Sequence, residues 1–424
     1  KFVADTPGDF TSGKLYVFKQ DENDPFNGNW IEIDNTDLET MVNLKDTAWA
    51  KSATLFIRLE WITEIDGKIY IAETGYDNVN KKSSWTGAVA IAGEDAIAEH
   101  HKARATAQGT QFTINDGTHY YDYYGRILVY DPVTDEVSVY LEGGPDYANE
   151  QSQAIADYPD IHLANPDGLG KITIGAKTYM VINEDLNGSS YNRLPSDFNG
   201  WACDMYLLDM DIENPTLDDL IRIGVGPNGS ELTGGNGTQD GKSIMVDIQH
   251  PSSSNTIPFN NASTLALTGF DKVADMSSAH ISVDWAKNDV FQGPTIPEIT
   301  TQVLFSGGVD EVTVVDTDGQ PDGTAIAKQG HDFIGISEVV PGEYWISVNH
   351  ETRNMNEKIG DGGGMTSFKV VREAVTDTFQ VVETTLADGR VGKFHNVDFV
   401  NTVGETWTNC GGNIAPDGRI WTAE

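Results

Sequence analysis

The chain has 424 residues, of which 65 are acidic and 27 are basic, so its formal net charge is −38. A surface with this charge repels nucleic acids and anionic membranes, and we expect neither as a partner. No apolar run approaches the roughly 20 residues that a membrane-spanning helix needs, so we also expect no membrane span.

Short strands separated by turn residues are the main predicted elements along the chain. A weak helical pattern covers residues 38–44. Residues 66–73 begin with an Asp-Gly turn and continue as a strand, and residues 126–140 predict a hairpin with its turn at Asp131. A second weak helical pattern covers residues 218–223. Because strands predominate, we expect an all-β fold.

One hairpin unit recurs in the sequence. Residues 66–73 (Asp-Gly-Lys-Ile-Tyr-Ile-Ala-Glu) have related copies at residues 240–247 and 417–424. In each copy an Asp-Gly turn precedes a strand that ends in a carboxylate. Repeated hairpins favour radially arranged four-stranded sheets, and the sequence therefore predicts a β-propeller. A β-sandwich is the alternative, but a single sandwich of this length would be unusual.

The two cysteines, Cys203 and Cys410, are too few for a disulfide framework, although one bridge between them is compatible with the sequence. Cys410 follows Asn409 and precedes two glycines. A thiolate in a glycine-rich turn allows the backbone to approach a bound ion closely. The other interpretation is a small buried hydrophobic side chain, and the residues alone leave both open.

Arg58 and Glu60 stand two residues apart, which places them on one face of an extended segment. A guanidinium fork suits a phosphoryl oxygen, and a nearby carboxylate suits a metal ion. A salt bridge within the sheet is the more usual role of such a pair.

Asn165 and Asp167 flank Pro166 in the sequence Asn-Pro-Asp-Gly. Their side chains offer the hard oxygen ligands that calcium takes. A plain turn initiated by Asn-Pro is the alternative, and locally it is the favoured one.

Further polar residues follow other predicted strands. Residues 183–185 (Asn-Glu-Asp) come after a strand, and His350 and Glu351 are either ligands or hairpin caps. We interpret His250 as structural, since a histidine in a turn usually bonds to the backbone.

Taken together, these segments resemble the PhoX family of alkaline phosphatases. Residues 409–412, with Pro416 and Glu424, are similar to the family's Asn-Cys-Gly-Gly…Thr-Pro…Glu-Glu motif. Residues 58–62 resemble its Arg-Pro-Glu-Trp segment, and residues 165–169 resemble its Pro-Asp-Gly-Leu loop. Residues 248–251 are similar to its Ile-Gln-His-Pro motif.

The resemblance implies a β-propeller, which we expect to be six-bladed, with a cluster of iron and calcium ions that hydrolyses phosphomonoesters. It also implies an extracellular or periplasmic location and small phosphate esters as substrates. Cys410 would be an iron ligand with a catalytic role, and Arg58 would hold the phosphate in catalysis. The remaining residues implied by the family are the metal ligands Glu424, Glu60, Asn165 and Asp167 and the substrate-binding Asn409.

The order of the motifs differs from that of the family. Residues 1–265 resemble the family's C-terminal portion and residues 266–424 its N-terminal portion. The chain is therefore either a circularly permuted propeller or two propeller segments joined in the opposite order, and in both cases we expect one domain. The family's middle stretch, with a His-Glu-Gly motif, is not recognisable. An alternative function follows: a non-catalytic, calcium-stabilised extracellular propeller that binds partners or self-associates through exposed strand edges. A propeller lactonase or esterase with one calcium ion would leave Cys410 without a role.

Overall fold

The computed structural model describes residues 1–6, 11–21, 28–54, 56, 58–75, 103, 106–107, 124–144, 163–185, 203–281, 289–353, 356, 358–360, 362–415 and 418–423. The chain forms two compact units. Unit 1 comprises Lys1–Asn165 and Ser190–Pro195, and unit 2 comprises Pro166–Ser189 and Ser196–Glu424. Each unit is described by itself below.

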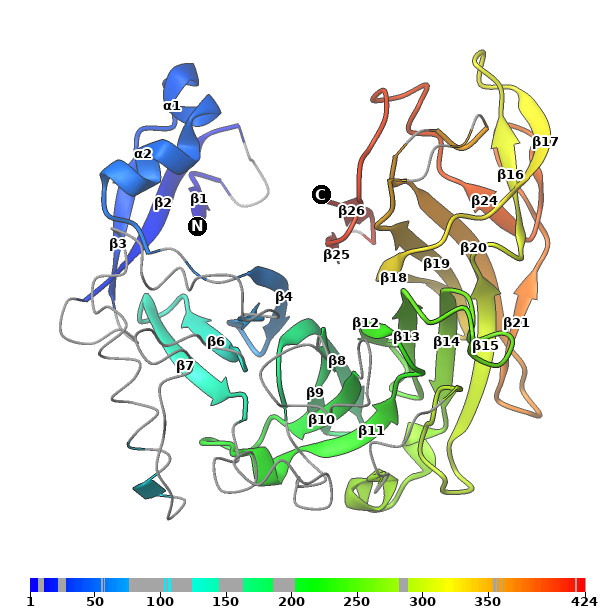
Figure 1. The fold of residues 1–424 in the computed structure, drawn as a ribbon, viewed down its shortest axis with the longest axis horizontal. Helices are drawn as coiled ribbons and strands as arrows, with labels where there is room; N and C mark the ends of the chain where they lie inside the picture. Colours follow the sequence, from blue (N-terminus) through cyan, green and yellow to red (C-terminus); the bar gives the residue numbers. More distant parts are fainter. Residues whose placement is uncertain are drawn as a thin grey trace. The chain divides into compact units, whose positions relative to one another are not determined.

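Among its described residues, unit 1 contains two antiparallel sheets and the short helices α1 and α2 (Figure 1). The three-stranded sheet consists of β1 (Phe2–Ala4), β2 (Gly13–Gln20) and β3 (Gly28–Ile33). The four-stranded sheet consists of β4 (Leu59–Ile65), β5 (Lys68–Glu73), β6 (Arg126–Asp131) and β7 (Glu136–Glu142), paired in sequence order. The helices are α1 (Leu38–Val42) and α2 (Leu44–Ala50).

The helical pattern at residues 38–44 is confirmed by α1 and the start of α2. Asp37 caps α1, because its side chain accepts a hydrogen bond from the backbone N–H of Thr40. The pattern at residues 218–223 was wrong. Only the single 3₁₀ turn η3 (Leu217–Asp219) forms there, and the β-branched residues that follow belong to a strand.

Two sheets of unit 2 each contain four antiparallel strands in sequence order. The first consists of β8 (Pro166–Ile174), β9 (Lys177–Glu184), β10 (Asp204–Asp209) and β11 (Ile221–Val225). The second consists of β12 (Glu231–Gly237), β13 (Ser243–Gln249), β14 (Ser263–Thr268) and β15 (Thr300–Ser306). The 3₁₀ turns η4 (Phe270–Lys272) and η5 (Met276–Ala279) follow β14.

The third sheet of unit 2 is larger, with the order β17-β16-β24-β20-β19-β18 and with β21 also paired to β20. Its strands are β16 (Glu311–Val315), β17 (Pro321–Ile326), β18 (His331–Val340), β19 (Glu343–His350), β20 (Met365–Arg372), β21 (Phe379–Val382) and β24 (Phe394–Asn396). Two small hairpins pair β22 (Thr384–Thr385) with β23 (Val391–Gly392) and β25 (Gly412–Ile414) with β26 (Ile420–Thr422).

The edge strands β8, β12 and β18 of the three larger sheets in unit 2 lie beside one another. Gly170 of β8 approaches β12 so closely that a Cβ atom on it would lie 2.1 Å from the carbonyl oxygen of Gly235. On its other side β12 contacts β18, since Asn236 Nδ2 donates to the backbone oxygen of Ile334 at 2.8 Å. Four-stranded meanders whose first strands adjoin are the blades of a β-propeller. This arrangement of antiparallel sheets confirms the predicted all-β propeller class. The number of six blades stays a prediction.

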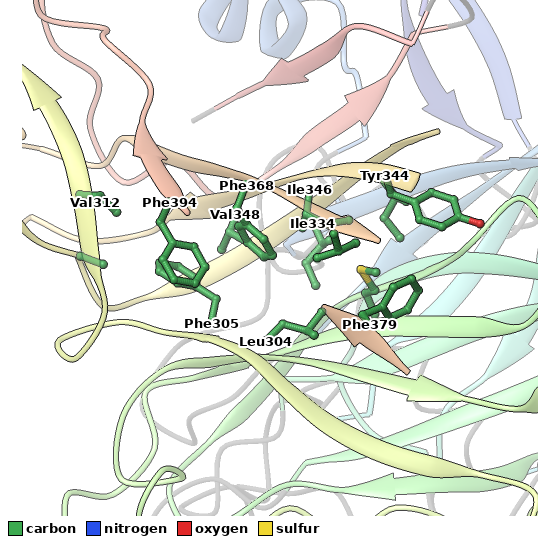
Figure 2. Packing of buried hydrophobic residues seen from close by; sticks show 14 of the residues in the cluster. Leu304, Phe305, Val312, Ile334, Tyr344, Ile346, Val348, Phe368, Phe379 and Phe394 are labelled. Atoms are coloured by element: carbon green, nitrogen blue, oxygen red, sulfur yellow. The ribbon is translucent and has the colours of Figure 1, made fainter. Parts of the chain in front are cut away.

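A buried apolar cluster joins the second and third sheets of unit 2 (Figure 2). Phe305 of β15 packs against Phe368 of β20 and Phe394 of β24, with ring centroids 5.6 and 4.9 Å away. Burial of each such ring stabilises the fold by about 1.5–3 kcal/mol. This core fixes the relative positions of the two sheets that carry part of the site described below.

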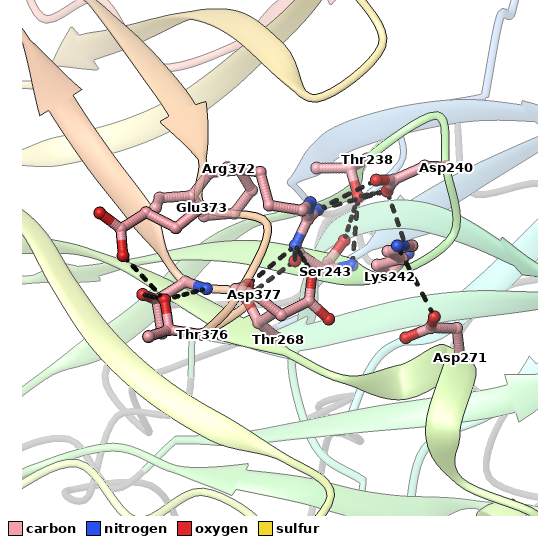
Figure 3. Close-up of polar contacts among 12 residues, drawn as sticks. Thr238, Asp240, Lys242, Ser243, Thr268, Asp271, Arg372, Glu373, Thr376 and Asp377 are labelled. Carbon is pink, nitrogen blue, oxygen red and sulfur yellow. Dashed lines mark hydrogen bonds and ion pairs between the residues drawn. The ribbon is translucent and has the colours of Figure 1, made fainter.

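A buried arginine also joins these two sheets (Figure 3). Arg372, at the end of β20, contacts Asp240 of the β12–β13 turn at 3.2 Å and Asp377 of the β20–β21 turn at 3.4 Å. Its guanidinium lies over the ring of Phe379, 4.4 Å from the centroid. Only 7% of the Arg372 side chain is exposed, so this ion pair is screened little by solvent.

The division at residue 265, which follows the family resemblance, is not a boundary between these two units. Strand β14 contains residue 265 and pairs with β13 before it and β15 after it. The assignment of residues 1–265 and 266–424 to family portions stays a prediction. In the described residues, no helix is both long enough and apolar enough to cross a membrane.

Candidate metal centre

Acidic and polar residues of unit 2 recur at one end of each sheet. In the first two sheets, the residue that begins the first strand pairs with the last residue of the second strand: Pro166 with Glu184 and Glu231 with Gln249. In the third sheet His331 pairs with His350. Residues at or next to these positions therefore meet where β8, β12 and β18 adjoin. The acidic ones are Asp167, Asp185, Glu231, Asp332 and Glu351.

Three of these carboxylates form a compact cluster, which we call the acidic trio: Asp167, Asp185 and Glu231. One oxygen from each lies within 4.8 Å of the others, and all three residues are buried. Burial raises the pKa of Glu231 well above its usual value, and the charges of Asp185 and Asp167 raise it further. A divalent cation would remove this repulsion and take hard oxygen ligands of this kind.

Local structure explains how Asp167 reaches the trio. Asn165 has a positive φ of 50°, and the pairing of β8 with β9 shifts register between Pro166 and Leu169. The shift is typical of a bulge, which redirects a side chain at a sheet edge. Gly168 completes the bend, because a Cβ atom there would lie 2.9 Å from Nδ2 of Asn183.

Asn183 adds a further oxygen donor close to the trio. Its residue is fully buried, and neither atom of its amide has a hydrogen-bond partner among the described residues. Buried polar atoms are nearly always satisfied, so such an amide indicates a partner that protein atoms do not supply. An amide oxygen next to three carboxylates fits a calcium site.

A conventional ion pair lies behind the trio and contrasts with it. Arg222 Nη1 donates to Asp204 Oδ2 at 3.1 Å, and both side chains are almost fully buried. The backbone N–H of Asp204 donates to Glu184 Oε2 at 2.9 Å. Here the guanidinium group of Arg222 balances the charge of the buried acid.

Cys410 lies one strand further along the same end of unit 2. Its backbone oxygen accepts hydrogen bonds from the N–H of Phe333 and from Asn349 Nδ2, both at 3.3 Å. Phe333 directly follows Asp332 at the start of β18. The Cys410 side chain is half-buried, and neither Cys410 nor the fully buried Cys203 forms a disulfide. The bridge that the sequence allowed is therefore absent from this structure.

The sequence was compared with known families and proteins. A family model described as alkaline phosphatase PhoX matches residues 9–252, which is more than half of the chain. The chain belongs to the PhoX family. The matched range includes the whole acidic trio as well as Arg58, Glu60 and Asn165, and it ends before Cys410.

No curated protein matches the chain. Among solved structures, a thermostable family-43 glycoside hydrolase is 9% identical, with coverage of 84% of this chain and 79% of that one and a TM-score of 0.34. An α-L-arabinofuranosidase from Lactobacillus brevis is 9% identical, with coverage of 86% and 94% and a TM-score of 0.34. A mannose phosphorylase from Leishmania mexicana is 10% identical, with coverage of 90% and 88% and a TM-score of 0.32. Likenesses at these scores carry no argument here.

The PhoX resemblance assigned Arg58 and Glu60, which lie in unit 1. Arg58 Nε and Glu60 Oε1 are 3.3 Å apart, and the side chains are 31% and 30% exposed. Arg58 has a φ of 57°, so it precedes β4 in a left-handed conformation and not in the extended one that the spacing suggested. The salt-bridge interpretation is confirmed. Binding of phosphate or metal by the pair stays a prediction, although Glu60 begins β4 much as Asp167 begins β8.

The other residues assigned through the PhoX resemblance lie as follows. Asn165 is buried in unit 1, and its Nδ2 donates to the backbone oxygen of Thr74 at 2.6 Å. Asn409 is also buried, and its amide bonds to Gly364 N–H at 2.8 Å and to Thr422 Oγ1 at 3.0 Å. Their roles in binding metal and substrate stay predictions. Glu424 and Pro416 lie outside the described residues.

Sequence reasoning found one member of the acidic trio and missed two. Asp167 stood in a recognisable Asn-Pro-Asp-Gly turn, and Asp185 lay in a segment that was noted but not assigned. Glu231 carried no local signal. Its register opposite Gln249, equivalent to that of Pro166 opposite Glu184, would have indicated it only once the strand pairing was known.

His331 and His350, which pair at the start of β18, each contact a threonine hydroxyl. His350 bonds to Thr366 Oγ1 at 2.8 Å and to the backbone oxygen of Gln329 at 3.2 Å. His331 is fully buried and lies 3.2 Å from Thr264 Oγ1. Burial lowers the pKa of His350 to about 3, so its imidazole is neutral at physiological pH.

Proposed function

We propose that this chain is a metal-dependent phosphomonoesterase that acts on small phosphate esters. Membership of the PhoX alkaline phosphatase family supports the reaction class. The observation that carries the proposal is the buried acidic trio, in which one oxygen from each of three carboxylates lies within 4.8 Å of the others. When bound, metal ions would neutralise the charge of the phosphoryl group and align the reacting oxygens.

The donor types support two kinds of metal ion. Asp167, Asp185 and Glu231 supply only oxygen, which suits calcium. Cys410 would supply sulfur, which suits iron, and Glu60 and Glu424 would each supply a carboxylate ligand to a metal ion. In this proposal Arg58 orients the phosphate by a two-pronged hydrogen bond and releases Glu60 to a metal ion.

We further propose that the protein acts in the extracellular space or the periplasm. Calcium sites of modest affinity are filled where calcium is abundant. The net charge of −38 also suits a surface that attracts cations.

The test measures hydrolysis of p-nitrophenyl phosphate by the full chain loaded with calcium and iron. We expect activity that a chelator abolishes and that Glu231→Gln lowers at least about tenfold, since the variant removes one of the trio's ligands. Glu311→Gln is the control, because Glu311 is an exposed carboxylate on β16, away from the trio. Equal loss in both variants, or hydrolysis unaffected by chelation, would contradict the proposal.

The second candidate function is a non-catalytic, calcium-stabilised binding or self-assembling module. The acidic trio is compatible with this function, because a calcium ion bound only by oxygen ligands can stabilise a fold without taking part in a reaction. This candidate predicts calcium-dependent stability, no bound iron and no hydrolysis. Elemental analysis and size measurements on the same sample separate the two functions.

A further inference from the structure

A buried lysine in unit 2 makes contacts that neither the family resemblance nor the acidic trio explains. Lys328 lies between β17 and β18 and is only 7% exposed. Its Nζ donates to three backbone oxygens, at 2.8 Å to Gly360, at 3.1 Å to Gly363, and also to Gly362. An ammonium group has three donors, so these carbonyls satisfy a cation that would otherwise be costly to bury.

The segment that Lys328 holds contains the consecutive glycines 362–364. A Cβ atom on Gly362 would lie 1.8 Å from the carbonyl oxygen of Thr406, and one on Gly363 would lie 2.2 Å from Asn409 Oδ1. Only glycine permits this approach of one backbone to another. Glycines 362–364 therefore pack closely against the segment that leads into Cys410.

Hydrogen bonds connect glycines 362–364 to the turn that contains Cys410. The N–H of Gly364 donates to Asn409 Oδ1 at 2.8 Å, and Asn409 Nδ2 donates to Thr422 Oγ1 at 3.0 Å. Asn349 Nδ2 then donates to the backbone oxygen of Gly411 at 2.8 Å. The turn that carries Cys410 is thus fixed by its backbone and by Asn409, while the thiol itself remains half-buried.

We propose that Lys328 is a positioning residue, which orders glycines 362–364 and through them the Asn409-Cys410 turn. Without the ammonium group, the buried carbonyls of Gly362 and Gly363 would lose this donor, so the segment would have to move. Asn409 would then lose the close contact with Gly363 that holds its side chain in place. The value of this order for catalysis rests on the proposed function, whereas the ordering itself does not.

The test compares alkylation rates of the two cysteines in the full chain as purified. Iodoacetamide is the probe, and peptide mass spectrometry quantifies Cys410 and Cys203 separately. Cys203 is fully buried and therefore reports global unfolding. Lys328→Met keeps the length of the side chain and removes the charge. We expect Cys410 to react at least about tenfold faster in this variant, with Cys203 unchanged, because local opening no longer breaks bonds to a charged donor.

Lys358→Met is the matched control. Lys358 is exposed, lies in the same segment and bonds to Asp322, so the variant removes the same charge without touching the glycines. It should react as the wild type does. Gly363→Ala provides a second route, since its Cβ would displace Asn409, and it should also speed the alkylation of Cys410.

An unchanged Cys410 rate in Lys328→Met would overturn the inference, as would equal acceleration of both cysteines, which indicates general destabilisation. If Lys328→Met does not fold, Gly363→Ala decides by the same two criteria. A protein that shows the expected alkylation pattern but hydrolyses no phosphomonoester would contradict the proposed function and leave this inference standing.

Discussion

Replacement of Asp167 by Asn removes one negative charge from the acidic trio and changes almost nothing in size. Two ionised oxygens no more than 4.8 Å apart repel each other by at least about 3 kcal/mol at an effective dielectric constant of roughly 20. Partial protonation of Glu231 relieves some of this repulsion. Without metal, we therefore expect Asp167→Asn to be more stable than the wild type by about 1–3 kcal/mol.

Calcium should reverse this order. A ligand at a hundred times its Kd stabilises the native state by about 2.7 kcal/mol. The wild type should gain this stabilisation, and Asp167→Asn should lose most of it, because the variant has one anionic ligand fewer.

Thermal unfolding in chelator and in millimolar calcium measures both effects. Asp204→Asn is the control, since Asp204 is a buried acid with a cationic partner, Arg222. Removal of one partner of a buried pair costs about 3–5 kcal/mol, and this cost should be the same with or without calcium. The reasoning would be refuted if Asp167→Asn behaved like Asp204→Asn, with a loss of stability in chelator and an undiminished response to calcium.

Three further outcomes are expected. Cys410→Ala should lower bound iron and hydrolysis together by at least about tenfold, measured by elemental analysis and p-nitrophenyl phosphate turnover, and full activity in the iron-loaded variant would contradict its role. His350 has a pKa of about 3 in the folded state against about 6.5 in the unfolded state, so folding loses about 2 kcal/mol from this residue as the pH falls from 7 to 5. Urea unfolding at pH 7 and pH 5 should therefore show that the free energy of unfolding falls less in His350→Gln than in the wild type. An equal fall in both proteins would contradict a buried, neutral imidazole at His350. Arg372→Met should lower the free energy of unfolding by about 3 kcal/mol, because it leaves Asp240 without its cation, although Asp377 keeps its ion pair with Lys272. A change within error of zero would be inconsistent with the ion pair.

The sequence was informative where the cause of a structure is local. Asp-Gly turns followed by alternating strands predicted hairpins, and Lys68–Glu73 forms the expected strand β5 after the turn at Asp66. The helical pattern predicted from residue 38 onwards is matched by α1, which begins at Leu38. At residues 218–223 the sequence predicted a helix, but the acidic residues there belong to the single 3₁₀ turn η3.

The site could be predicted only in part, because it depends on which strands become neighbours. Asp167 lies in a distinctive turn, but its approach to Glu231 depends on the glycine contact between β8 and β12. Lys328 gave no signal at all, since the carbonyl groups that it bonds belong to backbone more than 30 residues away. Pairwise contacts of this kind are invisible in one sequence.

Each of β8, β12 and β18 has an acidic residue at its first or second position: Asp167, Glu231 and Asp332. Aspartate and glutamate differ by one methylene group, so an exchange between them moves a carboxylate in or out while the backbone of the sheet stays in place. A substitution in one strand can therefore move one carboxylate toward or away from a bound ion, while the carboxylates of the other strands keep their positions. A scaffold with this property can change the size of the ion that it prefers through single substitutions, without any change in its topology.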